Sequence, residues 1–178
     1  MSAWEEMKIK DFIKSEDGIT AVEFSLVGMP FVLLMIGLME VGLAFSAASM
    51  LEGGTNTAAR MIRTGQVQLS ADPEGTFRDT LCEHVSAFIR CDDLVYEVLS
   101  VPDNEFTNVG GMAPDYDADG KMLSGGFDPG EENDVVLIRT FYDYSFFTYQ
   151  VGTLMSAGSF NSMPLMTTMV IKNEPYSF

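Results

Sequence analysis

One apolar run is long enough to decide how this chain must fold. It extends from Phe24 to Leu51, 28 residues in which Glu40 is the only ionisable side chain. Because about 20 apolar residues in a helix span a bilayer core, the run predicts a membrane-spanning helix with length left over. A buried core helix and a cleaved signal peptide are the alternatives. A signal peptide usually has an apolar region of only about 7–15 residues, close to the N-terminus.

The helix is expected to continue beyond the apolar run. The segment 56–65 starts with a capping residue type, Asn56, and ends at a glycine, Gly65. Gly53 and Gly54 can bend or loosen the helix between the two parts. A continuous helix over residues 19–64 would extend about 70 Å, well beyond a bilayer core of about 30 Å. Its far half must therefore pack on a domain or on other helices.

Two residues inside the apolar run need an explanation. Glu40 is protonated, or marks the outer end of the span, or finds a partner in another subunit, because an unpaired carboxylate in hydrocarbon is costly. Pro30 leaves the carbonyl of Leu26 without its helical donor. Small residues recur along the run and suit close packing against other helices; they are Gly28, Gly37, Gly42, Ala44, Ala47 and Ala48.

The remainder of the chain predicts an α+β fold. A second helix is expected at residues 73–89 from its apolar spacing. A strand rich in β-branched and aromatic residues is expected at 135–147, with further strands at 94–101 and 167–172. Residues 103–133 are rich in Gly, Pro and Asp and predict a long loop. We expect a small antiparallel sheet packed on the long helix together with the second helix.

Acidic residues dominate the part of the chain after the helix. The net charge is −16, and residues 66–178 hold 18 acidic side chains against five basic ones. This surface repels phosphate backbones, so it argues against nucleic-acid binding and is typical of a soluble exported domain. Three lysines precede the span, Lys8, Lys10 and Lys14, whereas Arg60 and Arg63 follow at a greater distance. This asymmetry predicts a cytoplasmic N-terminus.

Cys82 and Cys91 both follow the predicted span and lack the CxxC spacing of a metal site. An even number of cysteines outside the cytoplasm predicts one disulfide, which contributes up to about 3 kcal/mol. Two buried thiols are the alternative.

Asp115, Asp117 and Asp119, followed by a glycine, resemble the first half of a calcium loop. The twelfth position from Asp115 is Gly126 instead of a bidentate glutamate. A different calcium loop that uses Asp128 and a plain acidic surface turn therefore both remain open.

Signs of catalysis are absent from the sequence. The single histidine, His84, lies on the expected second helix, and GxSxG, HExxH and phosphate-loop motifs do not occur. We therefore expect that the protein is not an enzyme and needs no cofactor apart from the calcium considered above.

Gly18, followed by four residues and then by Glu23 and Phe24 at the head of the apolar helix, resembles the prepilin-peptidase site of type IV pilin-like proteins. The sequence AVEFSLVGMPFVLLMIGLMEVG, residues 21–42, resembles the N-terminal signature of the TadE-like family, which are pseudopilins of the Flp/Tad tight-adherence system. Further resemblance lies in AARMIRTGQV (58–67), the cysteine pair, VVLIRTFYDY (135–144) and the ending IKNEPY (171–176). That ending favours TadE over the related TadF, although both roles stay open.

The resemblance implies a pilin-like fold and a processing site. A membrane prepilin peptidase would cut between Gly18 and Ile19, leaving a leader (1–18), a transmembrane or pilus-core helix (19–64) and a periplasmic α+β domain (65–178). Glu23 would then form an assembly ion pair with the new amino group of Ile19, in its own chain or a neighbour's. Such a pair is stronger in low dielectric, and an unpaired Glu23 is penalised there.

The resemblance also implies a role and a location. The chain is expected to be a non-catalytic minor pilin that helps Flp/Tad pilus assembly or initiation, and so adherence and biofilm formation. Its partners would be the prepilin peptidase, other Tad minor pilins, the major Flp pilin and the inner-membrane Tad assembly platform. It would cross the inner membrane once, with its C-terminal domain in the periplasm, and could reach the pilus or cell surface. The alternative is a signal-anchored periplasmic binding module that holds calcium and never enters a filament.

Overall fold

The computed structural model describes residues 18–156 and 161–176. The chain divides into two compact units, one ending at Met39 and the other beginning at Glu40. Helix α2 (Ile19–Arg63) contributes to both units and is continuous through Gly53 and Gly54. Apart from Gly18, the expected leader lies outside the described residues.

The first unit, as far as it is described, is the beginning of α2. Its side chains from Thr20 to Met39 are exposed apart from partly covered glycines, and Pro30 lies inside the helix without ending it. Among the described residues, one helix is long and apolar enough to cross a membrane. An N-terminal apolar helix of this kind is consistent with a membrane anchor or a signal sequence.

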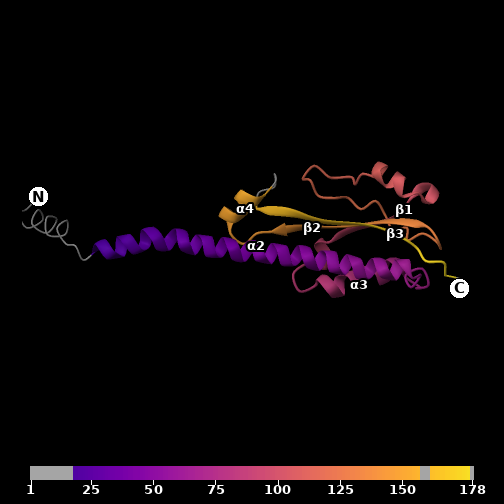
Figure 1. Ribbon diagram of the computed structural model, residues 1–178, viewed down its shortest axis with the longest axis horizontal. Helices are drawn as coiled ribbons and strands as arrows, with labels where there is room; N and C mark the ends of the chain where they lie inside the picture. Colours follow the sequence, from indigo (N-terminus) through magenta and orange to yellow (C-terminus); the bar gives the residue numbers. More distant parts are fainter. Residues whose placement is uncertain (1–17, 157–160, 177–178) are drawn as a thin grey trace, which may run out of the picture. The chain divides into compact units, whose positions relative to one another are not determined.

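The second unit is a three-stranded antiparallel sheet covered on one face by helices, as Figure 1 shows. The strand order is β1-β2-β3, with β1 at Val95–Ser100, β2 at Val135–Ser145 and β3 at Ser162–Lys172. Val95 pairs with Phe141 across β1 and β2. The whole of β2 pairs with β3, from Val135 with Lys172 to Ser145 with Ser162.

The core of this unit forms where α2 meets the sheet. Small and medium side chains at helical spacing are buried along one stripe of α2: Ala44, Ala47, Leu51, Ala58 and Ile62. They join a cluster with Val136, Ile138, Tyr142 and Tyr144 of β2. Thr55 and Thr140 share a buried hydrogen bond of 2.7 Å between their hydroxyls. The expected α+β fold is therefore confirmed.

Helix α3 (Pro73–Val85) packs against the same stretch of α2. Asp72 caps its first turn by accepting the N–H of Gly75 at 3.0 Å, and Phe77, Leu81 and Val85 are buried. A Cβ atom on Gly54 would lie 2.9 Å from Cγ1 of Val85. Glycine at this position is what lets the two helices approach so closely.

The end of α2 is joined to the end of β3. Gly65 ends the helix with a left-handed backbone, φ 76°, as expected for a stop glycine, whereas Asn56 lies inside the helix and is not a cap. Glu174 donates its N–H to the carbonyl of Arg63 at 2.9 Å, and its carboxylate pairs with the Arg63 guanidinium at 2.8 Å.

Several element boundaries differ from the sequence-based expectation. Helix α4 (Tyr149–Met155) was not expected, and β3 begins five residues before the expected Thr167. β3 tolerates Pro164 because it is an edge strand, where a missing N–H can face away from the ladder. The expected loop 103–133 contains two 3-10 turns, η3 (Pro102–Asn104) and η4 (Phe106–Gly111).

Candidate functional site

The expected processing site lies at the very start of the long helix. Gly18 is exposed, and no other group lies within 4 Å of the position where its Cβ atom would be. Helix α2 begins at the next residue, Ile19. The peptide bond between these two residues therefore lies at the border of the regular helix, without side chains packed around Gly18.

Glu23 and Phe24 follow one turn later, and both are exposed, Phe24 by 78%. None of the ion pairs found among the described residues includes Glu23. Glu23 follows the backbone of residue 19 by four positions, about one turn of α2. This placement lets the carboxylate reach an amino group at position 19 of its own chain or of an adjacent helix. The assembly ion pair itself stays a prediction.

Glu40, the second carboxylate in the apolar run, is held inside the second unit. It is only 4% exposed. Its Oε1 accepts the backbone N–H of Thr148 at 2.6 Å, and its Oε2 accepts the Thr148 hydroxyl at 2.7 Å. Charge-assisted bonds of this kind compensate a carboxylate for lost water. Glu40 thus has a partner in its own chain, an arrangement that none of the three sequence-based explanations included.

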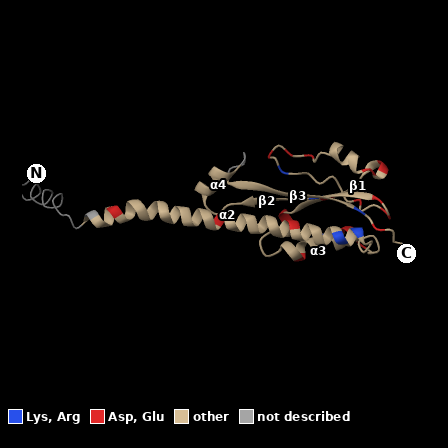
Figure 2. Cartoon of the chain, viewed as in Figure 1, with Lys and Arg blue, Asp and Glu red and all other residues tan. Residues whose placement is uncertain are grey.

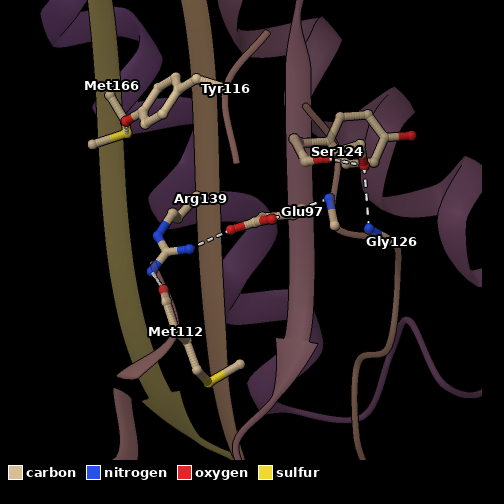
Figure 3. A network of polar contacts seen from close by, with 9 residues as sticks. Glu97, Met112, Tyr116, Ser124, Gly126, Arg139 and Met166 are labelled. Carbon is tan, nitrogen blue, oxygen red and sulfur yellow. Dashed lines mark hydrogen bonds and ion pairs between the residues drawn. The ribbon is translucent and has the colours of Figure 1, made fainter. Parts of the chain in front are cut away.

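A buried ion pair crosses the sheet on the face opposite α2. Arg139 of β2 lies directly across from Glu97 of β1 in the strand register, and their side chains pair with exposed fractions of 7% and 3%. Figure 3 shows that Arg139 also donates to the carbonyl of Met112. Glu97 accepts the N–H of Gly125 at 3.1 Å. The pair therefore fastens both sides of the long loop to the sheet.

The aspartates of the expected calcium loop take part in local turns. Asp117 accepts the N–H groups of Asp119 and Lys121 at 3.0 and 2.8 Å. Asp128 accepts the hydroxyl of Ser100 and the N–H of Gly130, and Asp115 is exposed. Within the described ranges, no group of three His, Cys, Asp or Glu side chains is arranged to hold a metal ion. Calcium binding stays a prediction, which a calcium titration by calorimetry would check.

The disulfide expected between Cys82 and Cys91 is present. It joins α3 to the 3-10 turn η2 (Cys91–Asp93), which directly precedes β1. The link therefore fixes the helix to the start of the sheet. His84 of the same helix is exposed and bonds through its ring to the carbonyl of Thr80 at 2.9 Å.

Tyr96 and Tyr144 are among the tyrosines of the second unit that have raised pKa values. Burial and a hydrogen bond to Glu74 raise the pKa of Tyr96 to about 12. Burial raises the pKa of Tyr144 too, and the nearby Glu40 carboxylate adds to the effect. Both phenols are therefore neutral at ordinary pH and serve as packing and hydrogen-bonding groups.

Sequence reasoning missed the buried pair and the Glu40 contact for different reasons. Glu97 and Arg139 each interrupt an apolar strand, and opposite charges in two neighbouring strands are a usable signal. Glu40 and Thr148 are 108 residues apart, and no local pattern links them. Only the fold brings that second pair together.

Comparison with known proteins gives one match. Residues 18–60 match the model of the TadE-like protein family, a segment that starts at the expected processing glycine and ends inside the second unit. No curated protein and no solved structure matches the chain. The segment from Gly18 to Arg60, which holds Glu23 and Glu40, is a TadE-like family domain.

Proposed function

We propose that this chain is a minor pilin of the Flp/Tad type that takes part in pilus assembly or initiation and supports adherence. The observation that carries the proposal is the overlap of the TadE-like domain with the bare part of α2. In that part, nearly all of the described side chains up to Met39 face outward. An apolar helix that its own chain leaves uncovered is suited to lipid first and to neighbouring helices afterwards.

The geometry at the start of α2 supports processing by a prepilin peptidase. Gly18 presents no side chain to a narrow cleavage cleft, and cleavage after it would free the amino group of Ile19 at the first turn of the helix. Glu23 then pairs with that amino group. In a low-dielectric filament core the pair is strong only when both groups meet, so it favours one axial register.

The proposal divides the chain into a leader (1–18), a transmembrane or pilus-core helix (19–64) and a periplasmic domain (65–178). TadE-like proteins are not known as enzymes, which fits a non-catalytic subunit. Its partners are the prepilin peptidase, the other Tad minor pilins, the major Flp pilin and the inner-membrane assembly platform. A cytoplasmic N-terminus would place the acidic domain and its disulfide in the oxidising periplasm.

Mapping the N-terminus of the protein from its native membrane tests this proposal. A mature chain that begins at Ile19 supports it, and an intact leader on all copies contradicts it. Gly18→Leu should abolish the cut because a branched side chain fills the cleavage cleft, whereas Gly18→Ala should retain part of it.

Pilus formation tests the role of Glu23 separately. Glu23→Ala should leave membrane insertion intact and impair assembly. Glu52→Ala is the matched control, because Glu52 is also exposed on α2 but lies in the second unit. Normal pilus numbers in the Glu23→Ala strain would show that the ion pair is not needed.

A further inference from the structure

Helix α4 and the residue before its cap expose a group of large apolar side chains. This group, the α4 patch, consists of Phe147, Tyr149, Leu154 and Met155, with exposed fractions of 83%, 62%, 86% and 38%. Leu154 and Phe147 are the most exposed large apolar residues in the described part of the chain, ahead of every side chain on the bare half of α2. Such exposure in a folded unit marks a surface that meets another apolar phase.

The α4 patch is fixed at one level along α2. Thr148, which lies between Phe147 and Tyr149 of the patch, donates its backbone N–H and its hydroxyl to Glu40, at 2.6 and 2.7 Å. Figure 1 shows α4 at the end of the sheet where β2 ends and β3 begins. Glu40 is also the first residue of the second unit. The patch therefore lies beside the first residue of the second unit, Glu40.

The length of the predicted membrane span indicates that lipid can contact α2 at the position of Glu40. From Phe24 to Met39 there are 16 residues, which rise about 24 Å in a helix. If the hydrocarbon core begins at Phe24, directly after Glu23, its thickness of about 30 Å carries acyl chains past Glu40 along α2. The apolar side chains that follow Glu40 on α2 fit contact with acyl chains, because Val41 is 40% and Phe45 is 74% exposed.

A carboxylate at this depth is costly unless it is shielded and hydrogen-bonded. The Thr148 contacts provide both conditions, since Glu40 keeps only 4% exposure and both of its oxygens have a donor. The same segment that shields Glu40 carries the α4 patch. The segment thus hides a charge on one side and presents apolar side chains on the other.

Charge distribution favours lipid as the partner. The chain has 26 acidic and 10 basic residues, yet none lies between Tyr144 and Ile171. Figure 2 shows α4 without coloured residues, whereas charges gather over the loop and the far end of α2. The neighbouring end of β2 carries one exposed charge, Asp143. Most of the second unit is repelled by anionic headgroups, and the uncharged segment that holds α4 approaches a membrane with less repulsion.

We propose that the α4 patch inserts into the boundary between headgroups and acyl chains of the membrane leaflet that the apolar run of α2 reaches near Glu40. Tyr149 suits this boundary because tyrosine combines an apolar ring with a polar tip. Phe147 and Leu154 enter the acyl region beside α2, as the apolar side chains of interfacial helices do. The inference requires that α2 crosses a membrane. It does not require that the chain enters a filament.

Fluorescence quenching by brominated lipids tests the insertion in the full chain. Trp4 is the only tryptophan, so Trp4→Phe gives a background without tryptophan. Tyr149→Trp reports on the α4 patch. Tyr116→Trp is the matched control, because Tyr116 is similarly exposed at 49% but lies in the acidic loop. Each variant is placed as one chain per nanodisc of phosphatidylcholine, with and without bromine on the acyl chains.

Bromine should lower the emission of the Tyr149→Trp variant about twofold, as expected for a ring at the headgroup boundary, and leave the Tyr116→Trp variant unchanged. Equal quenching of both variants would contradict the proposal, as would no quenching at position 149. An unquenched but blue-shifted emission at position 149 would mean that protein covers the patch, which also contradicts it.

Leu154→Glu in the Tyr149→Trp background gives a second check. Leu154 is 86% exposed, so the substitution leaves the fold intact, but a charge opposes insertion. Quenching should fall, whereas Leu123→Glu, at an exposed apolar position in the loop, should leave it unchanged. Unaltered quenching in the Leu154→Glu variant would overturn the inserted geometry. None of these outcomes depends on cleavage after Gly18, so the inference and the pilin proposal fail or succeed separately.

Discussion

The two halves of α2 belong to one continuous helix but meet different surroundings. Up to Met39 the helix carries large apolar side chains that stay exposed, such as Leu34 at 58%. From Glu40 onward it buries a stripe dominated by small residues, in which Ala47, Leu51 and Ala58 have no exposed surface. Small residues let a helix approach a sheet closely. Large apolar side chains instead suit contact with lipid acyl chains, which rearrange around them. The side chains, and not the helical backbone, thus decide which half faces which environment.

The two carboxylates of the helix show the same contrast. Glu23 is exposed and forms none of the ion pairs of the described residues, and Glu40 is buried with two donors from Thr148. A carboxylate satisfied within its own chain has a structural role. One left exposed at the start of an apolar helix is available to groups outside its own helix.

The largest effect should come from truncating a leucine in each half. Leu51→Ala removes a fully buried side chain and should lower the free energy of unfolding by about 2–5 kcal/mol. Leu34→Ala should change it by no more than about 0.5 kcal/mol. Guanidinium unfolding of the full chain in detergent micelles, followed by circular dichroism, measures both. Similar losses at the two positions would mean that the halves are packed alike.

The second prediction compares how much Glu40 and Glu23 contribute to the free energy of unfolding. Thr148→Val removes the hydroxyl donor to Glu40 and should cost about 1.5–3 kcal/mol, the range for bonds to charged groups. Thr153→Val is the control, since its hydroxyl bonds only to the carbonyl of Gln150 nearby. Glu23→Gln should leave the unfolding free energy unchanged. The contrast fails if Glu23→Gln destabilises the chain as much as Thr148→Val.

Adjacent glycines sharpen the comparison within the packed half. Gly54→Ala places a Cβ atom 2.9 Å from Cγ1 of Val85, and this overpacking should cost about 1–3 kcal/mol. Gly53→Ala meets no atom within 4 Å and should stabilise the helix by up to about 1 kcal/mol. Thermal unfolding of the two variants shows directly whether each substitution stabilises or destabilises the chain. Stabilisation by both would show that α2 and α3 can move apart freely.

The smallest effect concerns pH and a phenol of the second unit. The pKa of Tyr96 is about 12, above its ordinary value of 10.0, so the folded state holds this proton more tightly than the unfolded state. The resulting stability is present below pH 10 and is lost as pH rises through 12. Tyr96→Phe should therefore flatten the decline in unfolding midpoint between pH 10 and pH 12. Tyr149→Phe, on an exposed ring, should leave the decline unchanged.

Much of this architecture was predictable because it depends on local patterns. The long helix, the disulfide, and the central strand follow from an apolar run, an even cysteine count, and β-branched residues. Helix α4 was missed because seven residues without charges give too little periodicity. The start of β3 was missed because Pro164 argues against a strand until the strand is known to be at an edge. The shielding of Glu40 depends on Thr148, more than a hundred residues away, and only tertiary packing brings them together.

The junction between Arg63 and Glu174 gives the second unit a mechanical property. α2 runs alongside β2 and β3 (Figure 1), and those strands are paired over their full lengths. A pull on α2 at Glu40, resisted at Glu174, first strains the Arg63–Glu174 bonds and then draws β3 lengthwise along β2. The hydrogen bonds between the strands are then loaded together in shear and do not open one after another. The unit is thus arranged to withstand tension along the axis of its own helix.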